Sequence, residues 1–353
     1  MSRGSAAMAI EYTLNLRAGE LVEVRGAAEI LSTLDADGAL DALPFMPEML
    51  EYCGKRLRVY KRADKTCDTI RTSNTWSRRM FNAVHLATSR CDGASHGGCQ
   101  AQCLIFWKEA WLKRVEDDAS VEEPATASRS GRSLPVIDLE RLQAATRRAS
   151  DPATGKPAYA CQATELNRAT HDLAWWDARQ YFRELFSGNI EISAFVRTMG
   201  RATLNALQRL RDGRQFPAVE PRCKDKTPTA SLDLRPGELV RIRSKEEIFA
   251  TLNQQGRNRG LWFDVEMLPF CGRVARVKQR VDHIINEKNG EMMHFSNPCI
   301  MLEEIACGGC LSRERLFCPR AIYSYWREIW LERVVPSEVK TLQVEELTAA
   351  GSV

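Results

Sequence analysis

The sequence has little of what marks several common protein classes. None of its apolar runs approaches the roughly 20 residues that a membrane-spanning helix needs. Its first ten residues have neither a basic start nor a long apolar segment, so we expect no secretory signal. These absences predict a cytoplasmic protein without a membrane partner.

Several signatures of catalysis and of nucleic-acid binding are also missing. The sequence contains no P-loop, no Gly-x-Gly-x-x-Gly after a strand-like segment and no His-Glu-x-x-His. It has no dense tract of lysine and arginine, and its net charge is only +4 at pH 7. Attraction to phosphates dominates nucleic-acid binding, so a nucleic-acid partner is permitted but weakly supported.

What the sequence does have is cysteine, with twelve residues against only five histidines. In a reducing compartment, clustered cysteines more often bind metals or carry out redox chemistry than form disulfides. Scattered cysteines such as Cys161 and Cys223 fit a simpler role as small buried hydrophobic residues. The clustered cysteines therefore predict a metal.

The sequence also repeats itself. Residues 16–25 return as residues 234–243, and the spacing of 218 residues holds as far as Cys53 and Cys271. Each copy closes on a similar signature with two tryptophans, at residues 107–115 and 326–334. We therefore predict two domains of one kind. The expected boundaries are a first repeat at 11–115, a mostly flexible linker at 116–171, a helical pair at 172–211, a second repeat at 231–334 and a frayed tail at 335–353.

Within each repeat the pattern is mostly that of short strands. Residues 237–243 alternate as a half-buried strand does, Ser244 and Glu247 fit a capping box, and Asn289-Gly290 is a hairpin signal. We expect a mainly β fold with α (α+β), in which two SH3-like small barrels, each closed by a Trp-rich helix, are joined by a helical linker.

The opening Gly-x-x-Val-x-Val/Ile-Arg, at residues 19–25 and 237–243, resembles the first strand of SH3-like barrels, including those of nitrile hydratase β-type subunits. This resemblance covers about a dozen residues per repeat and implies the fold without the activity. The layout as a whole resembles bacterial proteins with a duplicated, cysteine-rich SH3-like module, and it implies no particular reaction.

The cysteine clusters supply soft donors for a tetrahedral site in each repeat. In the first repeat we expect Cys91, Cys99 and Cys103 to bind a metal together with His96 or His85. In the second repeat the expected ligands are Cys299, Cys307, Cys310 and Cys318. Cys53 and Cys271 could replace one donor or line a pocket. Zinc is the expected metal, as one or two ions, with iron as an alternative and metal-free thiols as another.

The paired tryptophans have two interpretations. Trp107 and Trp111, like Trp326 and Trp330, are four residues apart and would share one face of a helix. They would then seal the base of each barrel, or else line a groove for a partner. Glu48 and Glu266 could satisfy backbone amides near a turn, or line a pocket with Arg62 or Arg280.

Three functions follow from these observations. The first is a non-enzymatic, metal-stabilised tandem binding or scaffold protein that acts on a protein partner or a homo-oligomer. The second is a metalloenzyme, or a subunit of one, with its Cys/His site in the first repeat. The third is a nucleic-acid-binding protein, for which binding would depend steeply on salt.

Overall fold

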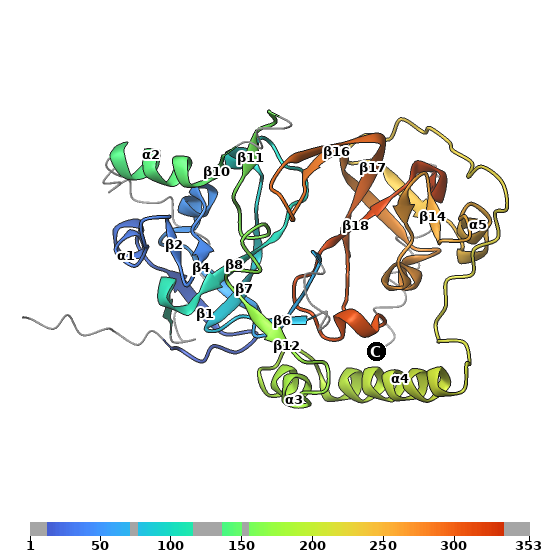
Figure 1. Ribbon diagram of the computed structural model, residues 1–353, viewed down its shortest axis with the longest axis horizontal. Helices are drawn as coiled ribbons and strands as arrows, with labels where there is room; N and C mark the ends of the chain where they lie inside the picture. The colour runs from blue at the N-terminus through green and yellow to red at the C-terminus, as the bar shows by residue number, and fades with distance from the viewer. Residues whose placement is uncertain (1–12, 71–76, 116–135, 150–154, 335–353) are drawn as a thin grey trace, which may run out of the picture. The chain divides into compact units, whose positions relative to one another are not determined.

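The computed structural model describes residues 13–70, 77–115, 136–149 and 155–334 (Figure 1). The fold is mixed α/β and rich in sheet, with 24% helix and 30% strand, and it contains a half-barrel sheet. Residues 116–135 and 150–154 of the predicted flexible linker, and the predicted frayed tail, lie outside the described residues. Within the described ranges, no helix is long and apolar enough to cross a membrane.

The chain forms two compact units that do not coincide with the two sequence repeats. Unit 1 consists of Met1–Phe195 together with Ile285–Met292 and Phe317–Arg320. Unit 2 consists of Val196–Ile284, Met293–Leu316 and Ala321–Val353. Two short segments of the second sequence repeat therefore belong to unit 1.

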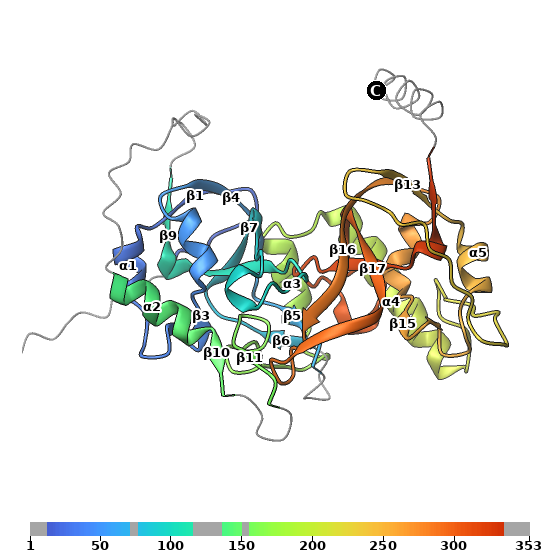
Figure 2. The ribbon, with the colours of Figure 1, turned by 90° about the horizontal axis from the view of Figure 1, so that it is seen from above.

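The first repeat forms a curved antiparallel sheet of five strands (Figures 1 and 2). Its strand order is β8-β7-β4-β1-β9. The bounds are β1 Leu21–Val24, β4 Arg56–Arg62, β7 Ala83–Arg90, β8 Leu104–Lys108 and β9 Leu112–Arg114. The short strands β2 (Ala39–Leu40) and β3 (Leu43–Pro44) pair with each other, while β5 (Thr66–Cys67), β6 (Ser77–Arg79) and β12 (His171–Leu173) form a small second sheet.

The second repeat forms a sheet with the corresponding order, β18-β17-β16-β13-β19. The bounds are β13 Leu239–Ile242, β16 Val274–Ile285, β17 Met292–Ala306, β18 Tyr323–Trp326 and β19 Leu331–Arg333. The pairing register is also retained, because Leu21 pairs with Arg58 and Leu239 pairs with Arg276, each 218 residues later. The repeated sequence thus builds the same sheet twice.

Helices and short turns surround these sheets. The α-helices are α1 Ala27–Leu31, α2 Val136–Ala145, α3 Arg179–Phe186, α4 Ile192–Leu210 and α5 Lys245–Ala250. The 3₁₀ helices are η1 Pro47–Tyr52, η2 Ala94–His96, η3 Glu109–Trp111, η4 Val265–Phe270, η5 Arg313–Arg315 and η6 Glu328–Trp330. The remaining short strands are β10 Arg147–Arg148, β11 Ala158–Tyr159, β14 Arg257–Asn258 and β15 Leu261–Trp262.

The closing tryptophans lie in the cores, but not on a helix. Trp107 belongs to β8 and Trp111 to the 3₁₀ turn η3, and Trp326 and Trp330 have the same arrangement in β18 and η6. The predicted Trp-rich helix is therefore wrong. All four indoles are 0% exposed, so the alternative of a partner groove is wrong as well. Their burial fits the other interpretation, in which they fill the core.

Each tryptophan signature also anchors the segment that precedes the first strand of its repeat. The carboxylate of Glu109 accepts hydrogen bonds from the backbone amides of Leu14, Asn15 and Leu16 at 2.7–3.1 Å. Arg62 lies 2.7 Å from the same carboxylate. Glu328 is bound in the same way by two amides and by Arg280 at 3.2 Å. Arg62 and Arg280 thus pair with these carboxylates instead of lining a pocket with Glu48 or Glu266.

Candidate metal centre

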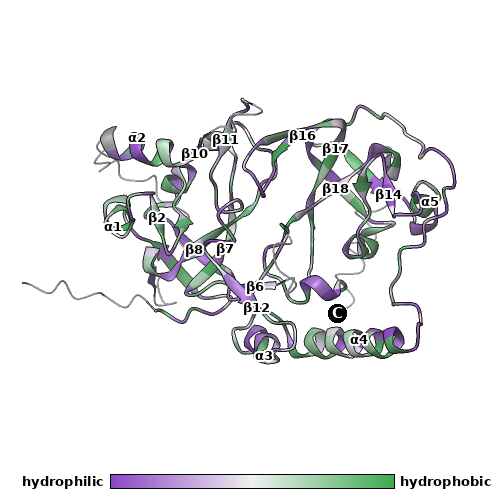
Figure 3. Ribbon diagram, in the orientation of Figure 1, coloured by the Kyte–Doolittle hydropathy of each residue, from purple (hydrophilic) through white to green (hydrophobic). Residues whose placement is uncertain are grey.

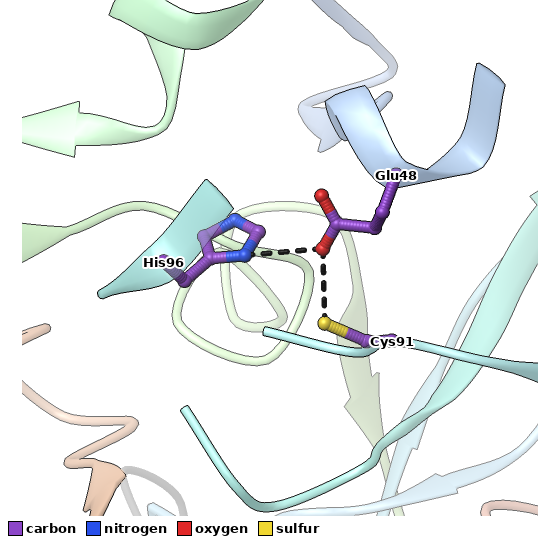
Figure 4. Close-up of side chains that lie close together, drawn as sticks. All are labelled: Glu48, Cys91 and His96. Atoms are coloured by element: carbon purple, nitrogen blue, oxygen red, sulfur yellow. Dashed lines mark hydrogen bonds and ion pairs between the residues drawn. The ribbon is translucent and has the colours of Figure 1, made fainter. Parts of the chain in front are cut away.

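Three metal-ligand side chains converge in unit 1: Glu48, Cys91 and His96 (Figure 4). Glu48 lies in η1, Cys91 directly follows β7 and His96 ends η2. One ligand atom from each residue lies within 4.8 Å of the others. In the described part of the chain, no other three His, Cys, Asp or Glu residues meet in this way.

Local backbone geometry brings Cys91 and His96 together. The amide of Cys91 donates to the carbonyl of Cys103 at 2.9 Å, which fixes the residue at the end of its strand. The loop then turns at Gly93, whose φ is +75°. A Cβ at this position would lie 2.0 Å from the backbone oxygen of Cys99, so the turn requires glycine. The carbonyl of Gly93 accepts a hydrogen bond from the amide of His96 at 2.9 Å.

One oxygen of Glu48 lies between the other two side chains. Oε1 is 3.0 Å from the Cys91 Sγ and 3.1 Å from the His96 Nδ1 (Figure 4). With zinc bonded at about 2.0–2.3 Å to oxygen, nitrogen and sulfur, tetrahedral ligands are separated by about 3.3–3.7 Å. The Glu48 oxygen would need to move only about half an ångström away from the Cys91 sulfur and the His96 nitrogen to reach these separations.

The centre contains buried polar atoms without hydrogen-bond partners. His96 is buried, with only 1% of its side chain exposed, and its Nε2 has no hydrogen-bond partner within the described chain. The other ring nitrogen, Nδ1, makes the close contact with Glu48 Oε1. Oε2 of Glu48 is also buried and unpaired. Unsatisfied buried polar atoms are costly, and a bound cation would satisfy them.

The electrostatics of the centre fit a carboxylate beside a protonated thiol. Burial by itself raises the pKa of Glu48, but the His96 ring and the Cys91 thiol outweigh it, so this pKa lies below its usual value. Burial raises the pKa of Cys91 well above its usual range, and the Glu48 carboxylate adds to the effect. Because the thiolate is the metal ligand, a metal would have to displace the proton of Cys91.

The second repeat provides an internal comparison for Glu48. Its counterpart Glu266 lies 218 residues later in η4. The Glu266 carboxylate accepts the backbone amides of Cys310, Leu311 and Ser312 at 2.6–3.1 Å. These bonds agree with the prediction that this glutamate satisfies backbone amides. The first repeat instead presents Glu48 with a thiol and a histidine ring.

The other ligands predicted for the first repeat do not join this group. His85 is fully buried, its Nδ1 is 2.9 Å from the carbonyl of Ile105, and its ring packs against Phe106. The Sγ of Cys99 accepts a hydrogen bond from the amide of Ile285 at 3.3 Å, within unit 1. Burial raises the pKa of Cys103, which favours its neutral thiol.

The four cysteines predicted to bind a metal in the second repeat are not brought together as a set among the described residues. Cys318 belongs to unit 1, where its Sγ accepts a hydrogen bond from the amide of Cys67 at 3.2 Å. Cys299, Cys307 and Cys310 belong to unit 2. Cys299 is buried with its Sγ 3.5 Å from Arg327.

Cys53 and Cys271 occupy matching turns. Each follows a 3₁₀ helix, η1 or η4, and precedes a glycine with positive φ. Both side chains pack against the core of their own repeat. Burial raises the pKa of each thiol to about 11. Their positions therefore fit a packing role, and neither residue joins the group around Glu48.

Residues 93–97 also read Gly-x-Ser-x-Gly, which is the pattern of a nucleophile elbow. In a hydrolase this turn connects a buried strand to a long helix. Here Ser95 lies inside the three-residue turn η2, which follows a loop. The segment therefore lacks the context that would make Ser95 a nucleophile.

Sequence reasoning did not identify Glu48 as a ligand. The available signal was the shared pattern Phe-x-x-Glu-Met at 45–49 and 263–267, which placed a glutamate at the same point of both repeats. The pattern cannot distinguish a carboxylate that binds amides from one that faces a thiol. No protein-family model matches the chain, and a search of the curated proteins finds no match.

Proposed function

We propose that unit 1 binds one divalent transition-metal ion between Glu48, Cys91 and His96, with zinc as the expected metal. The observation that carries the proposal is the convergence of the buried His96 ring, whose Nε2 has no hydrogen-bond partner, with a carboxylate and a thiol. Oxygen, nitrogen and sulfur are all donors that zinc accepts.

The role we propose for this ion is structural, in a non-enzymatic binding or scaffold protein. The side chains of His96 and Glu48 are only 1% and 5% exposed, which leaves little access for a substrate. A metal held there would link η1 to the loop after β7 and add its binding energy to folding. The two sheets of like order would form SH3-like modules in tandem, and a protein partner would bind to their surfaces or to the connecting helices.

A metalloenzyme is the second candidate, because the site offers three protein donors. Zinc sites with three protein ligands commonly keep a fourth position for water or substrate. The two roles differ in how accessible the bound metal is to small molecules in solution. A structural ion would exchange slowly and ignore small added ligands, whereas a catalytic ion would bind them and change its spectrum.

The test is metal analysis of the full chain, purified without added metal, beside three variants. We expect about one zinc per chain in the wild type, and almost none in His96→Ala or Cys91→Ser. His85→Phe is the matched control, since it removes a second buried histidine outside the group and should retain the metal. A metal-free wild type, or His96→Ala with its full metal content, would contradict the proposal.

Cobalt substitution adds an independent readout. A Co²⁺ ion bound by Cys91 should give a thiolate-to-cobalt absorption band, which Cys91→Ser would lose and Cys99→Ser would retain. Loss of the band in Cys99→Ser instead would favour the cysteine-rich ligand set expected from the sequence.

A further inference from the structure

Cys67 and Cys318 form a pair of buried thiols that the metal centre does not use. The two residues are 251 positions apart in the sequence, and both belong to unit 1. The backbone amide of Cys67 donates a hydrogen bond to the Sγ of Cys318 at 3.2 Å, and the two thiol groups are also hydrogen-bonded to each other. These contacts bring the Cys318 sulfur against the side chain of Cys67, which is the approach that a disulfide bond requires.

Neither thiol of this pair packs into the apolar clusters of the two repeats. Cys53 packs against the core of the first repeat, whereas Cys67 and Cys318 belong to none of the apolar clusters formed by the described residues. Cys67 lies in β5, within a small sheet whose other strands, β6 and β12, are largely hydrophilic (Figure 3). A role as small hydrophobic residues of a core therefore does not explain why these two thiols meet.

Two cationic side chains lie beside the pair. The guanidinium of Arg320 is 3.9 Å from the Cys67 sulfur and donates a hydrogen bond to the Cys67 carbonyl at 3.4 Å. Lys65 is buried, and its charge is attracted to both cysteines in their ionised form. Burial and the neighbouring thiol raise the pKa of Cys318 well above its usual range, whereas the backbone amide and the charge of Arg320 oppose this rise. Because the thiolate is the form that reacts with oxidants, the two cations favour the reactive state.

The segment that carries Cys318 is the part of the second repeat that a bond at this site would fix. Residues 317–320 belong to unit 1, although the sequence on either side of them belongs to unit 2. Within unit 1 the ring of Phe317 stacks on Phe195 with 5.4 Å between ring centroids, and Arg320 lies 3.3 Å from the carboxylate of Glu287. A disulfide would add a covalent link from this segment to β5, and reduction would leave only the noncovalent contacts.

We propose that Cys67 and Cys318 are an oxidation site, at which a peroxide produces a reversible disulfide that holds residues 317–320 on β5. The site is separate from the proposed metal centre and does not depend on it. The two cysteines are only 3% and 5% exposed, so a small oxidant such as hydrogen peroxide can reach them more readily than a bulky disulfide can.

The reaction takes two steps. One thiol first reacts with hydrogen peroxide: its sulfur bonds to one peroxide oxygen, the O–O bond breaks, and the other oxygen leaves as water with the thiol proton. The product is a sulfenic acid. The second thiol then attacks this sulfur, so that the S–S bond forms, the S–O bond breaks and a second water leaves. Two electrons pass from the two sulfurs to the peroxide, and a reducing dithiol returns them by thiol–disulfide exchange.

The test maps the disulfides of the full chain after treatment with hydrogen peroxide at about pH 8.5, where more of each thiol is ionised. The remaining thiols are blocked with N-ethylmaleimide, and the chain is digested with trypsin. Cleavage after lysine and arginine places Cys67 in the peptide 66–71 and Cys318 in the peptide 316–320, and neither peptide contains another cysteine. We expect the two peptides as one linked species, two hydrogen atoms lighter than their sum, which dithiothreitol separates.

Three variants and one unfolded sample serve as controls. Cys67→Ser and Cys318→Ser should each abolish the linked species. Cys53→Ser is the matched control, because it removes a thiol that packs against the core of the first repeat, and it should leave the linked species at its wild-type amount. Unfolding the wild type in urea before oxidation should lower the amount of this species at least tenfold, since the fold brings the two sulfurs together. The metal content of all three variants should stay unchanged before oxidation, so this result is independent of the metal centre.

The peptide map of the wild type decides the proposal even if a serine variant does not fold. Recovery of both peptides only as blocked thiols, or with their cysteines oxidised to sulfinic acids, would overturn it. A link from either cysteine mainly to a different cysteine would also overturn it, as would equal formation of the linked species in urea.

Discussion

At the residue scale, histidines of one chain can serve opposite purposes. His85 and His96 are both fully buried, and both were candidate ligands from the sequence. His96 faces a carboxylate and a thiol, whereas His85 packs against Phe106 and uses Nδ1 on a backbone carbonyl. Residue type and spacing identified both rings as candidates. The two rings differ in the direction in which each side chain points. That direction depends on the residues that surround the ring in the folded chain, and the sequence alone does not give them.

His85 should make the stability of unit 1 sensitive to acid. Burial lowers its pKa to about 3, and the positive charges of Arg320, Arg90 and Lys61 act in the same direction. Between pH 6.5 and about 3 the unfolded chain therefore binds a proton that the folded chain excludes, so stability falls as pH falls. In His85→Phe, the free energy of unfolding should fall less steeply as the pH falls. The difference in slope from the wild type should be up to about 1.4 kcal/mol per pH unit. Urea unfolding at pH 7, 6 and 5 measures this slope.

The control for that measurement is His171→Phe, because the ring of His171 is exposed. It should leave the slope as it is in the wild type. An unchanged slope in His85→Phe would contradict the expected effect of burial.

At the element scale, short local patterns in the sequence predict the correct elements, whereas the spacing of the tryptophans does not. The alternating segment became β13, and the capping box of Ser244 and Glu247 begins α5. The Asn-Gly hairpin joins β16 to β17, as that signal predicts. The prediction of a helix for the tryptophans is wrong because two residues four positions apart cover only one helical turn. Such a short spacing fits a strand followed by a 3₁₀ turn equally well.

The loop that contains η2 can be tested by comparing Gly93 with Gly54, a glycine elsewhere in the chain that has nearly the same φ. Gly93 has φ +75° and Gly54 has φ +76°. A Cβ on Gly93 would collide with the backbone of Cys99, whereas one on Gly54 would meet nothing within 4 Å. Gly93→Ala should therefore displace His96 and abolish metal binding. Gly54→Ala should keep the metal and cost only about 1–2 kcal/mol of stability. Metal analysis and urea unfolding of both variants measure the difference, and a full metal content in Gly93→Ala would contradict this account of the loop.

At the scale of the whole molecule, the repeat predicted two similar sheets but not the division of the chain. Two segments, Ile285–Met292 and Phe317–Arg320, belong to unit 1 although their sequence belongs to the second repeat. Aligning the copies matches Cys318 with Cys99 and predicts equivalent ligands. Instead, Cys318 contacts Cys67, which lies 251 residues earlier. Periodicity and spacing report local structure, and contacts over such separations depend on how complete elements pack.

The division into units leads to a prediction about chelation. The three candidate ligands all lie in unit 1, so removal of the metal should destabilise that unit alone. A bound ion at 1,000 times its Kd adds about 4 kcal/mol to the stability of the state that binds it. Calorimetry of the full chain should therefore show one transition moving to lower temperature in EDTA, while the transition of unit 2 stays in place. His96→Ala should show the lowered transition without EDTA and no further response to the chelator. If EDTA moved both transitions equally, the metal would stabilise more than unit 1, and if it moved neither, the centre would hold no structural ion.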